Sequence, residues 1–259
     1  MFGEIMFTTR FEINVINRKT NPMQAVDFAS RYTCPAIVTV PEMVAPFVAA
    51  RSIRRAMFKV IVAVDLPSGG NFAMQKLRDL GPDALAADGF DILTSPRRNA
   101  KEAFNEVKSL TDFIRTANPL ADVRWSLGAF DRPETDYIEH IKSVLKVPCN
   151  FLRTDHRTSY PGIKVDDHKK IVESIRKLIG VPIKVSGNVD IATYRAFEND
   201  KSIRFDLTLE QAQALIRAPQ ENNNEQKTQE QPPKQEKQEA RQQTIDGEKV
   251  IGSLGQDVE

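Results

Sequence analysis

The stretch Lys59-Val-Ile-Val-Ala-Val-Asp-Leu-Pro-Ser-Gly69 sets the structural pattern of this 259-residue chain. Its first half is a short apolar run rich in Val, and its second half is a turn with Pro and Gly. Strands of a parallel sheet that are buried on both faces have this composition. An amphipathic helical stretch, Phe72–Leu80, follows the turn. The segment therefore predicts one strand–helix unit of an α/β protein.

The same unit recurs along the first 218 residues. We expect strands within 5–16 and at 36–40, 60–64, 90–94, 123–127, 150–153, 183–185 and 203–207. Helices are expected at 23–31, 41–55, 72–80, 100–116, 135–145, 166–179, 191–198 and 209–217. Eight such units in a chain of this length predict a (β/α)8 TIM barrel. A doubly wound open sheet is the alternative, but neither a Gly-x-Gly-x-x-Gly nor a Walker A motif follows any strand.

The composition changes at Pro219. From there to Glu259 the chain has no Phe, Tyr, Trp, Met or Cys, and residues 219–243 are mostly Gln, Glu, Asn, Lys and Pro. Such a segment cannot bury enough apolar surface to offset its chain entropy, so we predict that it is disordered. The predicted domains are a barrel over 1–218 and a tail over 219–259. The net charge of +1 divides into +5 before Pro219 and −4 after it.

Several classes of protein are excluded by what the sequence lacks. Its longest apolar stretches, such as Met43–Ala50, are too short to span a bilayer, and no basic-then-apolar leader begins the chain. We therefore expect a cytoplasmic protein with no membrane partner. The two cysteines and three histidines form no metal pattern, and we predict no metal and no cofactor. The basic cluster Arg51, Arg54 and Arg55 lies at the end of a predicted helix, where positive charges interact favourably with the helix dipole. We therefore do not expect this cluster to bind nucleic acid.

Two charged residues lie inside predicted apolar strands. In TIM barrels, functional residues lie at the carboxyl ends of the strands. Asp91 stands in Phe-Asp-Ile-Leu, and Lys184 stands in Pro-Ile-Lys-Val. A charge is costly to bury without a partner. A lysine in a dry pocket can act as a nucleophilic amine. The alternatives are that Lys184 reaches solvent at the barrel mouth, or that it pairs with Asp91 for structural reasons.

Five stretches, in this order, resemble strands of the deoxyribose-phosphate aldolases, a family of class I, lysine-dependent aldolases. They are Cys34–Pro41, Lys59–Gly69, Asp88–Leu93, Asn150–Thr154 and Ile183–Asn188. The resemblance implies an aldolase-type TIM barrel. It also implies that Asp91 matches the acid of the fourth strand and Lys184 the second lysine, on the seventh strand. Ser186, Gly187 and Asn188 match the substrate-binding residues that follow that lysine.

The sequence departs from the family at the residue that defines its chemistry. The Schiff-base lysine of the family falls on Arg153, and a guanidinium cannot form an imine as an amine does. The glycine pair after the seventh strand reads Gly187-Asn188, and Asp206 near the end of the eighth strand would repel a phosphate dianion. The resemblance therefore implies a catalytically degenerate relative.

We predict a binding, structural or regulatory protein whose polar tail contacts a protein partner. Aldolase-like barrels with such tails resemble head-assembly proteins of large tailed bacteriophages, among them an inhibitor of the prohead protease, which would place the protein in the host cytoplasm. One alternative is an active class I aldolase, a lyase acting on a small aldehyde or sugar phosphate, with Lys184 as the Schiff-base amine and Asp91 as its proton partner. Another is a module that binds a small anion through Arg153.

Overall fold

The computed structural model describes residues 8–16, 20–66, 70–94, 99–129, 134–155 and 162–218, with the side chains of 134–137 excepted. All of these belong to one compact unit, Met1–Glu221, and the second unit is Asn222–Glu259. The predicted tail, 219–259, lies outside the described residues, so its disorder and the boundary at 218 stay predictions.

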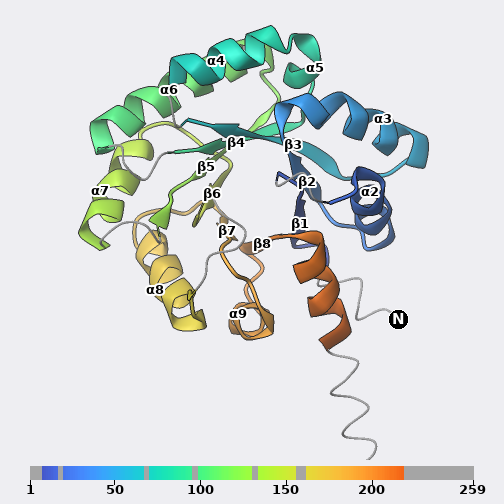
Figure 1. Cartoon of the computed structure of the whole chain (residues 1–259). Coiled ribbons are helices and arrows are strands. Elements are labelled where there is room, and N and C mark those ends of the chain that lie inside the picture. The colour runs from blue at the N-terminus through green and yellow to red at the C-terminus, as the bar shows by residue number, and fades with distance from the viewer. Residues whose placement is uncertain are drawn as a thin grey trace, which may run out of the picture. The chain divides into compact units, whose positions relative to one another are not determined.

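Eight parallel strands close into a barrel in the order of the sequence (Figure 1). They are β1 Phe11–Asn14, β2 Ala36–Thr39, β3 Lys59–Asp65, β4 Gly89–Leu93, β5 Asp122–Ser126, β6 Phe151–Arg153, β7 Ile183–Val185 and β8 Ile203–Leu207. The barrel closes between β1 and β8, where Phe11 lies opposite Phe205. The prediction of a TIM barrel is confirmed, and the open sheet is excluded.

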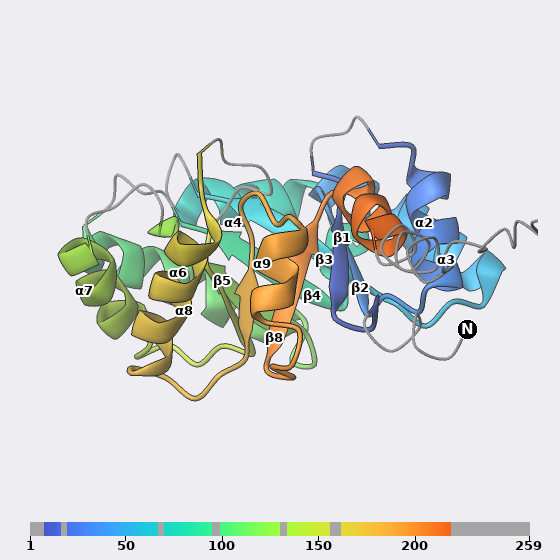
Figure 2. The same ribbon diagram turned by 90° about the horizontal axis from the view of Figure 1, so that it is seen from below.

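The helices lie outside the ring of strands (Figures 1 and 2). They are α2 Pro22–Arg31, the 3-10 helix η1 Pro41–Met43, α3 Val44–Arg54, α4 Gly70–Asp79, α5 Pro82–Leu85, α6 Ala100–Ala117, α7 Glu134–Val144, α8 Val165–Arg176, α9 Ile191–Ala196 and a last helix over 209–218. The helix expected over 41–55 is therefore split into η1 and α3. The ring of Pro46 would clash with the carbonyl of Glu42 in a continuous α-helix, but it is tolerated in the first turn of α3.

The outer face of the strands, which the helices cover, is mostly apolar all round the barrel. The inner face is apolar only where β2, β3 and β4 lie side by side. On β3, for example, Val60, Val62 and Val64 belong to the main core that the helices cover. A smaller apolar cluster, which includes Val38 and Ile61, comes from the alternate positions of β2, β3 and β4 that face the barrel interior. The rest of the described interior is mostly charged or polar, with Glu12, Asn14 and Arg124 among its residues. The strand pairs and the two apolar clusters that the structure describes all lie within residues 8–218.

Gly89 begins β4 at a point where two neighbouring strands approach closely. A Cβ atom at this position would lie 2.8 Å from the backbone oxygen of Asp122 and 2.9 Å from Cδ1 of Ile61. We expect Gly89→Ala to lower the free energy of unfolding by about 1–3 kcal/mol, because the backbone oxygen of β5 cannot move aside cheaply. Urea unfolding followed by circular dichroism measures this loss.

Gly180→Ala is the matched control. A Cβ atom at Gly180 meets nothing within 4 Å, and the position is exposed. Its free energy of unfolding should stay within about 0.5 kcal/mol of wild type. Equal stability of the two variants would show that the contact at Gly89 does not constrain the barrel.

Candidate functional site

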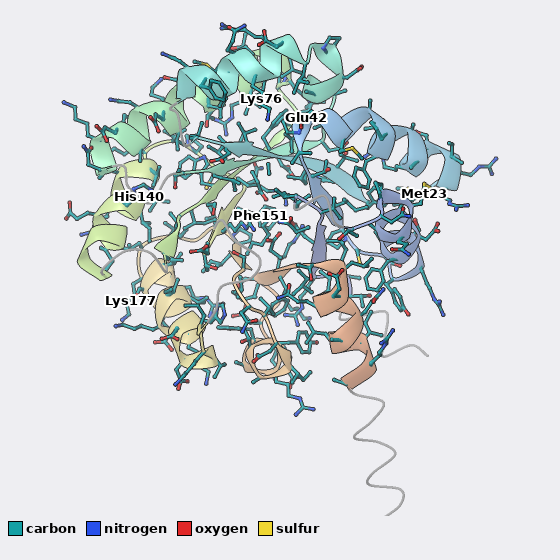
Figure 3. The ribbon with its side chains drawn as sticks, viewed as in Figure 1. Met23, Glu42, Lys76, His140, Phe151 and Lys177 are labelled. Carbon is teal, nitrogen blue, oxygen red and sulfur yellow. The ribbon has the colours of Figure 1, made fainter. Side chains whose placement is uncertain are left out.

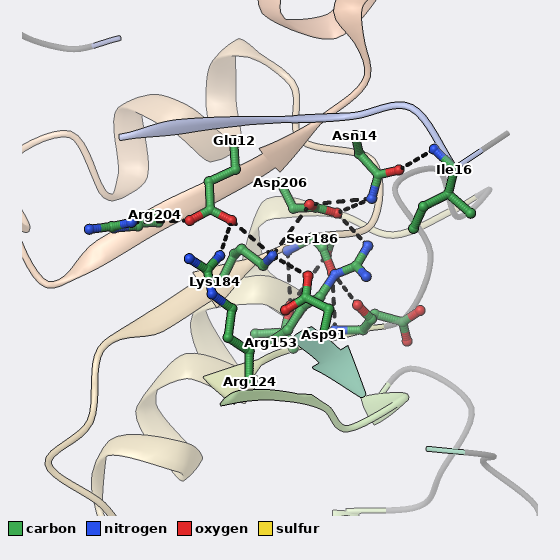
Figure 4. Close-up of polar contacts among 12 residues, drawn as sticks. Glu12, Asn14, Ile16, Asp91, Arg124, Arg153, Lys184, Ser186, Arg204 and Asp206 are labelled. Carbon is green, nitrogen blue, oxygen red and sulfur yellow. Dashed lines mark hydrogen bonds and ion pairs between the residues drawn. The ribbon is translucent and has the colours of Figure 1, made fainter. Parts of the chain in front are cut away.

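Six fully buried charged side chains form one network inside the barrel (Figure 4). They are Glu12 on β1, Asp91 on β4, Arg124 on β5, Arg153 on β6, Lys184 on β7 and Asp206 on β8. The network holds three carboxylates and three cations, so its formal charges balance. Buried charges are tolerated only when they are paired and hydrogen-bonded, and this balance lets the barrel interior hold them.

The ammonium of Lys184 lies among all three carboxylates. Its Nζ is 2.6 Å from Oδ2 of Asp91, 2.9 Å from Oε2 of Glu12 and 3.6 Å from Oδ1 of Asp206. Asp91 and Lys184, which the sequence singled out separately, are thus brought together by the barrel. Lys184 is completely buried, so it does not reach solvent at the barrel mouth.

Glu12 links Lys184 to two arginines. Its carboxylate accepts hydrogen bonds from Nη1 of Arg124 at 2.6 Å and from Nη1 of Arg204 at 3.1 Å. Both guanidiniums also lie over the ring of Phe151, at 4.9 Å and 4.4 Å from its centroid. A cation over an aromatic face is attracted by the ring quadrupole, so Phe151 helps to hold the two arginines beside Glu12.

The pKa of Glu12 shows how these cations outweigh burial. Burial by itself raises the pKa of this carboxyl, but the charges of Arg124, Lys184 and Arg204 lower it by more, and the pKa lies well below its usual range. For Arg124, burial lowers the pKa and the carboxylates of Glu12 and Asp91 raise it by more, so the net shift is upward. Both members of the pair are therefore charged in the folded protein.

Arg153 is already neutralised by a carboxylate. Its Nη2 donates to Oδ2 of Asp206, which also accepts a hydrogen bond of 3.1 Å from Nδ2 of Asn14. Asn14 is held in turn by the backbone N–H of Ile16, which donates to its Oδ1 at 3.0 Å. Arg153, which the resemblance matched to the family's Schiff-base lysine, is thus an ion-paired guanidinium, and the match itself stays a prediction. Asp206, expected to repel a phosphate, serves as the partner of Arg153.

The three predicted binding residues after β7 form a fixed turn. The hydroxyl of Ser186 donates to the carbonyl of Asp155 at 2.5 Å and accepts from the N–H of Asp155 at 3.1 Å, so it joins the ends of β6 and β7. Gly187 and Asn188 follow with φ angles of 84° and 34°, in the left-handed region. The hydroxyl of Ser186 is occupied by the backbone, and a role for these residues in binding substrate stays a prediction.

The sequence analysis did not single out three charged strand residues, Glu12, Arg124 and Arg204. The pattern that marks them is a charged residue between apolar neighbours in a strand. Glu12 stands in Phe-Glu-Ile and Arg124 in Val-Arg-Trp, and each is a charge between apolar strand residues. The same pattern drew attention to Asp91 and Lys184. Applied to every strand, it finds five of the six members of the network; Arg153, followed by Thr154, is the exception.

Other candidate sites are weaker in the part of the chain that the structure describes. No group of three His, Cys, Asp or Glu side chains there could hold a metal ion, and no helix there is long and apolar enough to cross a bilayer. Burial raises the pKa of both Cys34 and Cys149 to about 12, so neither thiol is an activated nucleophile.

The basic cluster at the end of α3 is partly neutralised by carboxylates. Arg51 pairs with Asp88, and Arg54 pairs with Asp27.

Comparisons with known proteins bear on the fold. No family model and no curated protein matches the chain. Among solved structures, deoxyribose phosphate aldolase from Aeropyrum pernix is similar, with a TM-score of 0.68 and 13% identity over 85% of this chain and 93% of that one. An aldolase named QR15 has a TM-score of 0.65 and 15% identity, over 84% and 97% of the two chains. At these identities the likeness establishes an aldolase-like TIM barrel fold and nothing about activity.

A similar fold occurs in an enzyme whose name places it in another superfamily. 2,3-Dimethylmalate lyase, a member of the PEP mutase/isocitrate lyase superfamily, has a TM-score of 0.55 and 10% identity, over 89% of this chain and 86% of that one. TIM barrels host many chemistries, so the function of this chain has to be argued from its own side chains.

Glu12→Gln tests whether the charge network holds the barrel together. Gln keeps the size of the side chain but leaves the charges of Arg124 and Lys184 without one of their carboxylates. We expect the free energy of unfolding at neutral pH to fall by about 3–5 kcal/mol, as when one partner of a buried ion pair is removed. Urea unfolding measures the loss, and the exposed Glu139→Gln should change stability by about 0.5 kcal/mol or less.

The loss should also depend on pH. The pKa of Glu12 is lower in the folded protein than its ordinary value of 4.5, so the unfolded chain binds its proton first as the pH falls. The stability that Glu12 contributes is therefore complete above pH 4.5 and is lost progressively below it. The difference between wild type and Glu12→Gln should narrow below that pH. A difference that stays constant down to about pH 3 would contradict the ionised network.

Proposed function

We propose that this protein is a non-catalytic aldolase-like barrel that serves as a binding or structural protein. The observation that carries the proposal is the position of Lys184, fully buried and within 3.6 Å of three carboxylates. In this arrangement the charges inside the barrel stabilise one another.

Schiff-base chemistry needs an amine with a free lone pair and space for a carbonyl carbon beside it. The ion pairs of Lys184 with Asp91 and Glu12 require the protonated ammonium, which has no lone pair. Arg153 cannot replace Lys184, because a guanidinium remains protonated and forms no imine.

An active class I aldolase is the second candidate, and one observation favours it. Asp91 Oδ2 lies 2.6 Å from Nζ of Lys184, the reach of a proton-transfer partner, and its Oδ1 is buried without a hydrogen-bond partner among the described residues. In this version Lys184 would be the amine and Asp91 would move protons. Binding of a small anion through Arg153 is less favoured, because Asp206 already neutralises its charge.

Trapping with borohydride separates the two candidates. Full-length protein is incubated with acetaldehyde, or with a sugar phosphate, and then reduced, digested and mapped by mass spectrometry. We expect adducts on exposed lysines such as Lys169 and none on Lys184, because the buried ammonium has no lone pair to attack the carbonyl. Lys184→Met should give the same set of adducts as wild type. An adduct mapped to Lys184 would establish an imine-forming enzyme and overturn the proposal.

The tail is the segment that we propose contacts a protein partner. It is long, polar and acidic, as in flexible tethers and segments that order on binding. The partner class stays the prediction made from the sequence, an assembly protein or a protease of a phage head in the host cytoplasm. The partner would be recognised through the tail, with the barrel as a rigid carrier.

A chain that ends at Ala218 tests the role of the tail. Because the strand pairs and the core lie within residues 8–218, this chain should keep its circular dichroism spectrum. Immobilised full-length protein should capture at least one partner from its native cell that the shorter chain does not, as identified by mass spectrometry. Identical sets of captured proteins would show that the tail has no part in binding.

A further inference from the structure

A cavity of about 170 Å³ lies outside the charged interior, beside the carboxyl ends of β1 and β2. The start of α2, the 3-10 helix η1 and the first turn of α3 complete its lining with Pro22, Glu42, Met43 and Phe47. Thr39 is the last residue of β2, and Val38 before it belongs to the apolar cluster inside the barrel. Since side chains alternate along a strand, Thr39 points outward into the layer between strands and helices. The cavity is therefore separate from the network around Lys184.

The lining combines apolar walls with two unpaired hydroxyls. Val15, Met43 and Phe47 supply apolar surface. Thr39 is completely buried and Thr20 is 7% exposed, and neither Oγ1 has a hydrogen-bond partner among the residues that the structure describes. Most buried polar groups in proteins are hydrogen-bonded, so two unpaired hydroxyls in one cavity point to a bound group that can donate to them and accept from them.

The charge at the cavity is compensated. Glu42 lies in the lining, but its carboxylate pairs with Nζ of Lys76 at 3.1 Å, and Figure 3 labels both side chains. The molecule that fits is therefore neutral. An apolar cavity of roughly 150 Å³ is known to hold a molecule the size of benzene, so a volume of 170 Å³ fits a single ring. Apolar walls with a few placed polar groups are typical of small-molecule sites.

We propose that this cavity binds a small neutral molecule that carries one apolar ring and one hydroxyl or carbonyl oxygen. The ring packs against Val15, Met43 and Phe47, and the oxygen hydrogen-bonds to Thr20 and Thr39. The site does not use Lys184, so it stands whether or not the barrel forms imines.

Phenol and toluene are the probes, because they share a ring and differ in the hydroxyl. Full-length protein is titrated with each and followed by NMR. Wild type should bind phenol about tenfold more tightly than toluene, since only phenol satisfies the two threonines. Thr39→Val keeps the shape of the side chain, and it should weaken phenol binding by about 2- to 10-fold and leave toluene binding equal or stronger. Thr20→Val should also weaken phenol binding without weakening toluene binding. It replaces Thr39→Val in the test if that variant does not fold.

Thr111→Val is the matched control. Thr111 lies on α6, away from the cavity, and its hydroxyl is also buried without a partner. The control should therefore bind phenol as wild type does. Failure of wild type to bind phenol would overturn the proposal and leave water as the partner of the two hydroxyls. Equal binding of phenol and toluene would overturn it as well, as would an unchanged phenol affinity in the Thr39→Val or Thr20→Val variant that folds.

Discussion

The interior of this barrel depends on the contact between the carboxylate of Glu12 and the ammonium of Lys184. These two groups come from β1 and β7 and lie 2.9 Å apart in a region with no access to solvent. Glu12 also binds Arg124 of β5 and Arg204 of β8, so one side chain joins four strands. Because an unpaired buried charge is so costly, the other charged strand residues have to match this pair in sign and position.

The same constraint explains why the two faces of the sheet differ. Outside the strands, apolar side chains pack against helices, as in any TIM barrel. Inside, β2 and β3 contribute apolar residues, whereas β1 and β4 to β8 contribute the charged ones. In this interior Asp206 neutralises Arg153, so the aldolase-like fold holds a guanidinium on β6 without leaving it as an unpaired buried charge.

The barrel interior and the cavity beside β1 and β2 therefore differ in the side chains that line them. The barrel interior holds balanced charges that form ion pairs with one another. The cavity beside β1 and β2 is mostly apolar and holds two hydroxyls without a hydrogen-bond partner among the described residues. Buried polar atoms without a hydrogen-bond partner among the described residues occur in both regions, for example Oδ1 of Asp91 in the interior and Oγ1 of Thr39 at the periphery. The two peripheral hydroxyls, those of Thr20 and Thr39, share one cavity outside the ion-pair network.

Local sequence determined the elements of this fold, because hydrophobic period and turn residues act over a few positions. The run at Lys59–Asp65 and the Asn-Pro start of α2 were sufficient to predict a strand and a helix. Asp91 and Lys184 also stood out locally, as charges between apolar neighbours. Their pairing with each other was one of the alternatives that the sequence offered, and the structure shows it. Glu12 and Asp206 did not follow as partners of Lys184, because this depends on which strands face each other once the barrel has closed. Arg153 and Asp206 are 53 residues apart, and only the tertiary structure decided that they pair.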